Sequence, residues 1–104
     1  MQAVRREGKR IRTDHLEVRA LASLLPYARV GFVVPKYKHS GVARNQLKRR
    51  LREIVRTRLL ATLPPGDVVI RSNPAAYAAS FEQLVAELEA AGERARRALA
   101  ARGA

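Results

Sequence analysis

One segment of the chain concentrates side chains that could bind phosphate. Residues 43–56, ARNQLKRRLREIVR, contain six Lys or Arg residues and a single acid, Glu53. Guanidinium groups offer paired, planar donors to phosphate oxygens and can stack on bases, and the amide of Asn45 could contact a base edge or a ribose hydroxyl. Like charges one helical turn apart repel each other by roughly a few tenths of a kcal/mol, so this crowding indicates an anionic partner. The plain alternative, a solvated surface helix, normally mixes both signs.

Groups that could cleave a nucleic acid directly are sparse. The two aspartates, Asp14 and Asp67, are far apart in the sequence, and the glutamates are scattered or continue the polar side of the last helix. The clustered carboxylates of a two-metal nuclease are therefore not indicated. His15 and His39 could form an acid/base pair, but lone histidines in loops or strands are more often polar surface residues. The absence of cysteine excludes disulfides and thiolate metal sites. From the sparse carboxylates and histidines, we predict neither catalytic nor metal-binding residues.

Charge is divided unevenly along the chain. Residues 1–60 hold 16 Lys or Arg and 4 acids, whereas residues 61–104 hold 5 of each, so the formal net charge of +12 belongs to the first part. This asymmetry favours a polyanion bound on one part of the surface. No apolar run approaches the roughly 20 residues of a membrane span, and the start, MQAVRREGKR, lacks the apolar region of a signal peptide. We expect a cytoplasmic nucleic-acid-binding protein, folded as one domain over residues 1–104.

Hydrophobic spacing predicts the element order α-β-β-α-β-α. A short helix should end near Gly8, a long helix should run from about 43 to 63, and a last helix should follow the N-cap Ser80. Strands are predicted over HLEVRAL, RVGFVV and DVVIR. This order indicates an α+β fold, a two-layer α/β sandwich with helices on a small sheet. The predicted core residues are Leu16, Val18, Ala20, Val30, Phe32, Val34, Leu47, Leu51, Ile54, Val55, Phe81, Leu84, Val85 and Leu88.

The long helix should carry its basic residues beside its apolar stripe. At about 100° per residue, the apolar positions form one continuous stripe, and a polar flank lies next to it rather than opposite. A helix packed on a sheet through that stripe would present the flank at the edge of the domain. We call this flank the basic ridge; it consists of Asn45, Lys48, Arg49, Arg52 and Arg56.

The basic helix also resembles a family signature. GVARNQLKRRLRE is similar to the signature of the bacterial ribonuclease P protein subunit, in which Arg-Asn is followed by Lys-Arg and a further Arg. The segments GKR, RVGFVVPK and DVVIRSNPAA, followed by an amphipathic helix, match the family in order and spacing. The resemblance therefore covers nearly the whole chain.

The resemblance implies a non-catalytic protein subunit of a ribonucleoprotein endonuclease. That enzyme removes the 5′ leader from precursor tRNA, with magnesium held mainly by its RNA subunit. The implied partners are the ribonuclease P RNA and precursor tRNA, with no membrane and no protein partner. The family places its basic helix in a left-handed β-α-β crossover within a mixed sheet. The residues implied to bind the catalytic RNA are Arg44, Asn45, Lys48, Arg49, Arg52 and Lys36.

The resemblance further implies a cleft for the single-stranded leader, formed by the sheet and the first helix. Family members usually have aromatic residues there, and several basic residues upstream of Met1. This chain instead has Met1 and Arg5 on the helix, and Arg19 at a strand position that is often Tyr. We therefore expect a cleft that depends more on charge than on stacking. The predicted leader-binding residues are Arg5, Arg19, Val33 and Tyr37, the last between Lys36 and Lys38.

Three other protein classes could explain the charge. A ribosomal or other structural RNA-binding protein accounts for the basic composition but not for the ordered matches. A helix-turn-helix module needs a short helix before the basic one, whereas a strand and a loop are predicted there. A catalytic nuclease lacks the clustered acids that it would need.

Overall fold

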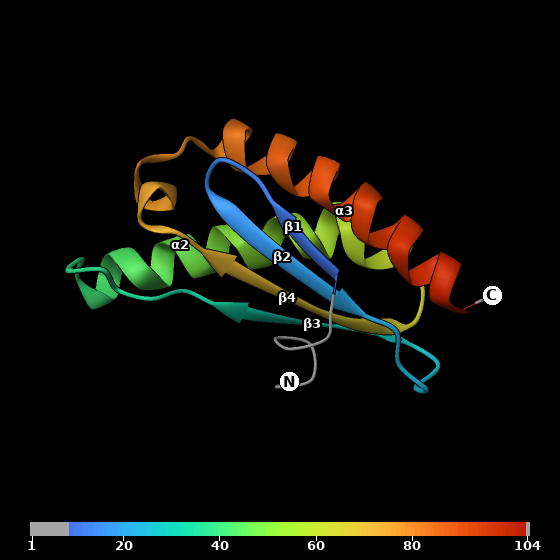
Figure 1. The fold of residues 1–104 in the computed structure, drawn as a ribbon. Helices are drawn as coiled ribbons and strands as arrows, with labels where there is room; N and C mark the ends of the chain where they lie inside the picture. The colour runs from blue at the N-terminus through green and yellow to red at the C-terminus, as the bar shows by residue number, and fades with distance from the viewer. Residues whose placement is uncertain (1–8, 104) are drawn as a thin grey trace.

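The computed structural model describes residues 9–103, which form a four-stranded sheet and two long helices (Figure 1). The predicted first helix, with Met1 and Arg5, lies outside the described residues. The strands are β1 (Lys9–Arg12), β2 (Leu16–Leu21), β3 (Ala28–Val33) and β4 (Gly66–Ser72), and the helices are α2 (Gly41–Ile54) and α3 (Phe81–Gly103).

The sheet is mixed and has the strand order β1-β2-β4-β3. β2 runs antiparallel to both β1 and β4, while β3 and β4 are parallel and are connected through α2. The predicted α+β class and the β-α-β crossover are therefore confirmed, and the hand of the crossover stays a prediction. The prediction of three strands was wrong, because β1 was missed. Its four residues, KRIR, contain one apolar side chain, Ile11, too few for an alternating pattern to be recognised.

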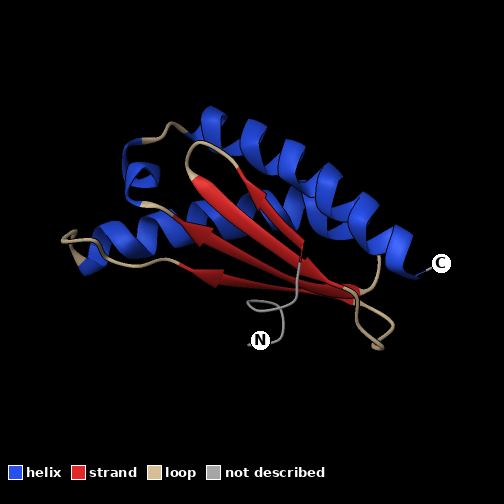
Figure 2. Ribbon diagram, in the orientation of Figure 1, coloured by secondary structure: helices blue, strands red, loops and turns tan. Residues whose placement is uncertain are grey.

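The two helices cover one face of the sheet (Figure 2), and no helix of residues 9–103 covers the other, which we call the open face. Alternate strand residues point toward the helices, and nearly all of the predicted core residues are buried or packed against the core. Phe81 was predicted to be buried, but 45% of it is exposed. It is the first residue of α3 and lies beyond the part of the helix that packs on the sheet.

The long basic helix begins at a serine cap and changes its winding near its end. The Ser40 hydroxyl accepts a hydrogen bond from Ala43 N (3.1 Å), so the helix begins at Gly41, two residues before the predicted start. After Ile54 it continues as a π-helical turn (η1, Val55–Leu59) and a 3₁₀ turn (η2, Leu60–Thr62). The overall extent was predicted correctly, but the change in winding was not. The π turn brings Leu59 against Gly92 of α3, where a Cβ would lie only 2.6 Å from Leu59 Cδ2.

A reciprocal cap fixes the start of α3. Gln83 N donates to the Ser80 hydroxyl (3.1 Å), and Ser80 N donates to Gln83 Oε1 (2.8 Å). This capping box confirms Ser80 as the predicted N-cap.

Candidate nucleic-acid interface

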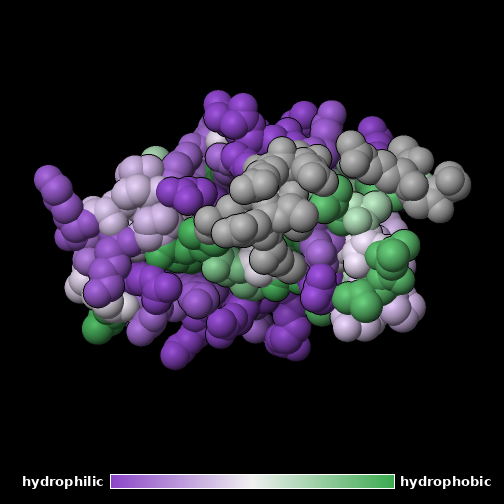
Figure 3. Space-filling model, turned by 60° about the horizontal axis from the view of Figure 1, so that its bottom comes forward, coloured by the Kyte–Doolittle hydropathy of each residue, from purple (hydrophilic) through white to green (hydrophobic). Residues whose placement is uncertain are grey.

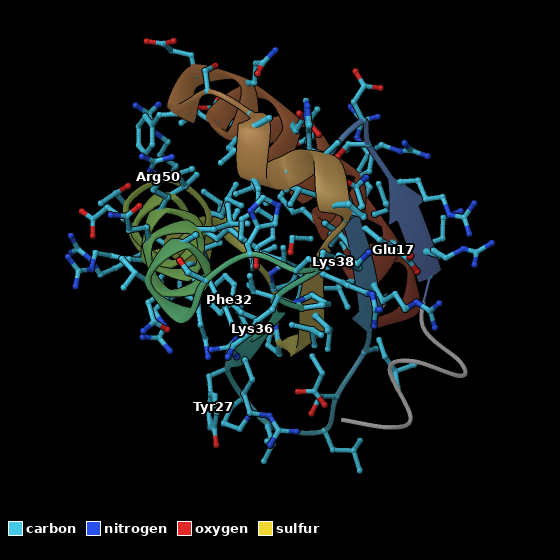
Figure 4. The ribbon with its side chains drawn as sticks, turned by 90° about the vertical axis from the view of Figure 1, so that its left-hand side faces the viewer. Glu17, Tyr27, Phe32, Lys36, Lys38 and Arg50 are labelled. Atoms are coloured by element: carbon cyan, nitrogen blue, oxygen red, sulfur yellow. The ribbon has the colours of Figure 1, made fainter. Side chains whose placement is uncertain are left out.

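The basic ridge lies on the exposed flank of α2, with its last member, Arg56, in the π turn η1 that continues the helix. Leu47, Leu51 and Ile54 point into the core, which turns the neighbouring polar flank outward. Among residues 9–103, no acid forms an ion pair with Lys48, Arg49 or Arg52. Arg56 differs, because its guanidinium lies 2.7 Å from the Glu53 carboxylate. Figure 4 shows α2 nearly end-on, with nitrogen-tipped side chains, Arg50 among them, projecting from its outer side. Three cations of the ridge are therefore available to an external anion.

Arg44 has a partner within the protein. It is half-buried, and its Nε donates to the carbonyl of Val34 at 2.8 Å. This bond joins the first turn of α2 to the chain that leaves β3. One edge of the guanidinium is thereby fixed, so Arg44 connects the basic ridge to the sheet.

The open face of the sheet carries a groove lined mainly by arginine. The register places Arg10 opposite Arg19, and Arg12 opposite Glu17, on the face away from the helices. The groove, which we call the sheet groove, has a volume of about 310 Å³. Its lining residues are Arg10, Arg12, Glu17, Arg19, Val33, Val69 and Arg71. Figure 3 looks at the molecule from below the view of Figure 1 and shows a mostly hydrophilic surface crossed by an apolar strip.

The single acid of the sheet groove is paired with one of its arginines. Arg19 Nε donates to Glu17 Oε1 at 2.8 Å. Partial burial raises the pKa of Glu17, but the hydrogen bond and charge of Arg19 and the charges of Arg10 and Arg12 outweigh it, so the pKa lies below its usual value. Glu17 is thus held ionised and orients Arg19. With four arginines and one glutamate, the groove keeps a positive charge.

Tyr37 extends the sheet groove at one end. A second hollow of about 270 Å³ shares Arg12, Glu17 and Arg71 with the groove and adds Tyr37. The Tyr37 hydroxyl donates to the Ser72 carbonyl at 3.2 Å. The predicted leader residues Arg19 and Val33 therefore line the sheet groove, Tyr37 lines the adjoining hollow, and Arg5 lies outside the described residues.

The loop between β3 and α2 holds Tyr37 in an unusual backbone conformation. Tyr37 and Lys38 have φ values of 47° and 71°, a region that non-glycine residues rarely occupy. Such conformations persist where surrounding contacts impose them, often at functional sites. Here the Tyr77 hydroxyl donates to the Pro35 carbonyl at 2.6 Å. Figure 4 shows Lys36 and Lys38 on this loop, and both are exposed.

Comparisons with known proteins identify the family. A family model described as Ribonuclease P matches residues 1–96 of the chain. The chain belongs to the ribonuclease P protein family. The ribonuclease P protein component of Syntrophobacter fumaroxidans is 41% identical over 90 residues, which cover 84% of this chain and 74% of that protein. The ribonuclease P protein component of Streptomyces bikiniensis is 44% identical over 96 residues, covering 86% and 77%.

Solved structures of ribonuclease P proteins share the fold. The protein from Thermotoga maritima superposes with a TM-score of 0.79 at 26% identity, covering 89% of this chain and 88% of that chain. A Staphylococcus aureus structure gives a TM-score of 0.77 at 21% identity, covering 85% and 81%, and supports the fold alone. The predicted resemblance is confirmed: the chain is an RNA-binding ribonuclease P protein with a role in tRNA processing, rather than a ribosomal or other structural RNA-binding protein.

Three arginines of the sheet groove were not predicted from the ribonuclease P resemblance. Arg10 and Arg12 lie on β1, the strand that was not predicted. Arg71 lies on β4 and reaches the same groove because β4 pairs with β2. The alternation of basic residues around Ile11 is the one sequence signal that could have indicated them.

Neither histidine is placed for acid/base catalysis with the other. His15 is half-buried and pairs through Nδ1 with Glu87, so the expectation of a surface residue was wrong for it. His39 stacks on Tyr77 with ring centroids 3.9 Å apart. Within the described chain, no three His, Asp or Glu residues are grouped so that they could hold a metal ion. No helix in this part of the chain is both long and apolar enough to span a membrane.

Proposed function

We propose that this chain is the non-catalytic protein component of a ribonuclease P whose RNA subunit contains the active site and holds magnesium. The observation that carries the proposal is a family match over residues 1–96 combined with two separate cationic surfaces. The described acids also lack the grouping that a protein-based metal site needs. The protein then contributes binding and position, and the RNA contributes the chemistry.

The basic ridge is the proposed contact with the catalytic RNA. Its unpaired cations can bind phosphates without first breaking an internal ion pair, and Asn45 is exposed beside them. Lys36 and Arg44 extend this surface toward the loop before α2. The proposed residues are Lys36, Arg44, Asn45, Lys48, Arg49 and Arg52.

The sheet groove is the proposed contact with the single-stranded leader of precursor tRNA. Its apolar floor, Val33 and Val69, suits the faces of unpaired bases, and its arginines suit the backbone phosphates. Tyr37 supplies an aromatic ring at one end. We add Arg10, Arg12 and Arg71, which line the same groove, to the proposed contacts. Because α2 packs on the other face of the sheet, the protein can contact both RNAs together and reduce the repulsion between them.

Reconstitution tests this function. The protein is mixed with a transcribed ribonuclease P RNA and a precursor tRNA at low magnesium. We expect stimulated 5′ cleavage that disappears when the RNA is omitted. Cleavage by the protein alone would place the chemistry in the protein, and no stimulation would favour an RNA-binding role outside this enzyme.

A pair of variants tests the leader contact. Arg19→Ala should weaken the binding of a precursor with a leader several-fold and leave leaderless tRNA unaffected. Arg94→Ala is the matched control, because it removes the same charge from an exposed position on α3. Equal binding of the leader-bearing precursor by both variants would refute the leader assignment.

A further inference from the structure

A carboxylate of α3 holds the turn between β1 and β2. Glu87 Oε1 accepts hydrogen bonds from the Thr13 hydroxyl (2.5 Å) and from His15 N (2.8 Å), and Glu87 Oε2 pairs with His15 Nδ1. Only 15% of the Glu87 side chain is exposed. Burial raises the pKa of Glu87, but the hydrogen bonds from Thr13 and His15 outweigh it and lower the pKa below its usual value. Both carboxylate oxygens are therefore occupied by one short segment more than 70 residues away.

The same turn is also held by Asn73, the residue that follows β4. Asn73 N donates to the His15 carbonyl, and Asn73 Nδ2 donates to the Asp14 carbonyl, both at 3.0 Å. Thr13 and Asn73 both line the hollow beside Tyr37. We use the name turn clasp for this turn, the residues that hold it and the hydrogen bonds between them; its residues are Thr13, Asp14, His15, Asn73 and Glu87. The clasp thus lies directly against the proposed RNA surface.

The strand that leads into this turn, β1, is only four residues long and lies at the edge of the described sheet. Among the described residues, β1 pairs only with β2, and it also packs against α3. Of its four residues, only Ile11 is buried. Arg10 lies directly opposite Arg19, and like charges in that position destabilise strand pairing. An edge strand of this kind needs a fixed end to keep Arg10 and Arg12 at the wall of the sheet groove.

We infer that Glu87 is a positioning residue for leader binding, acting through the turn clasp on Arg10 and Arg12. Glu87 is not among the described residues that line the sheet groove, and it fixes the end of β1 from which the two arginines extend. Glu87 does so from the helix layer, on the far side of the sheet from the groove. The inference rests on the proposed leader-binding role of the sheet groove.

Glu87→Gln tests the clasp. The amide keeps the size of the side chain but loses its charge and one of its two acceptor oxygens. In the reconstituted holoenzyme, we expect several-fold weaker binding of a precursor with a leader, and unchanged affinity for leaderless tRNA and for the catalytic RNA. Glu82→Gln is the matched control, because Glu82 is exposed on the same helix and has no ion pair within the described chain. Thr13→Val, which removes one donor and no charge, should shift leader binding in the same direction.

A double-variant cycle separates positioning from general stability. In an Arg10→Ala/Arg12→Ala background, Glu87→Gln should cause no further loss of leader binding. Additive losses, or a parallel loss of catalytic-RNA affinity, would show that Glu87 acts on the whole fold and would overturn the inference. If the arginine variant lowers leader binding but Glu87→Gln and Thr13→Val do not, the inference alone fails. If Arg10→Ala/Arg12→Ala has no effect on leader binding, the assignment of the sheet groove to the leader is refuted, and the inference about Glu87 is refuted as well.

Discussion

The unpaired cations of the basic ridge should set the salt dependence of catalytic-RNA binding. Log affinity falls linearly with log salt, with a slope of about 0.9 per phosphate contact for duplexes and about 0.7 for single strands. Lys48, Arg49 and Arg52 have no internal ion pair among the described residues, so each can replace counterions on one phosphate. A variant with all three changed to Ala should lower the slope by roughly two to three. From about 50 to 200 mM salt, the parent should lose roughly 20- to 40-fold more affinity than the variant.

The assay is fluorescence anisotropy with labelled ribonuclease P RNA across a potassium chloride series. Arg56→Ala is the internal control, because Arg56 belongs to the same ridge but is paired with Glu53 at 2.7 Å. Its effect on the slope should be smaller than that of Arg49→Ala. Parallel plots for the parent and the triple variant would refute the role of the ridge in phosphate binding. Equal effects of Arg49→Ala and Arg56→Ala would show that internal pairing does not matter.

Three further predictions concern stability. Arg44→Ala removes the hydrogen bond to Val34 O and should lower the free energy of unfolding by about 1 kcal/mol, measured by urea denaturation, while the domain stays folded. Leu51→Ala truncates a side chain with no exposed surface and should lower it by about 2–5 kcal/mol in the same assay; a loss well below this range would contradict the packing. Because folding lowers the pKa of Glu87, its ionisation stabilises the fold fully above the ordinary value of 4.5, and this stabilisation is lost as the pH falls through the lowered pKa. In thermal unfolding from neutral to acid pH, the advantage of the parent over Glu87→Gln should therefore shrink toward zero, and a constant difference would contradict the clasp.

Local sequence patterns predicted the elements whose apolar spacing continues over several turns or alternations. The stripe Leu47, Leu51 and Ile54 is buried as expected, because its spacing fits one helix face whatever the rest of the fold does. Phe81 continues the stripe of the last helix by spacing alone, but as the first residue of α3 it stays 45% exposed. β1 could not be recognised, since its identity depends on pairing with β2 rather than on its own four residues.

The two proposed RNA surfaces also differ in how far local sequence patterns could predict them. The basic ridge lies on a single helix, so a helical wheel was sufficient to find it. The sheet groove combines residues from all four strands, and a non-consecutive strand order decides which of them meet. Glu87 was one of several scattered acids in the sequence, because its partners lie more than 70 residues away. Arg19, Val33 and Tyr37 were predicted from the family resemblance, because no local sequence pattern places these three residues in one site.

The central position of β4 also decides when the protein can fold during its synthesis. Among the described strands, β3 pairs only with β4, which follows it in the chain only after the whole of α2. The highly basic first sixty residues therefore leave the ribosome before β4, the strand that joins β2 to β3 in the sheet, has been made available for pairing. Pairing over such a separation is slow compared with hairpin closure. Until Gly66–Ser72 emerges, β3 and the β1–β2 pair cannot join in one sheet, and insertion of β4 between β2 and β3 then completes the face that carries the sheet groove.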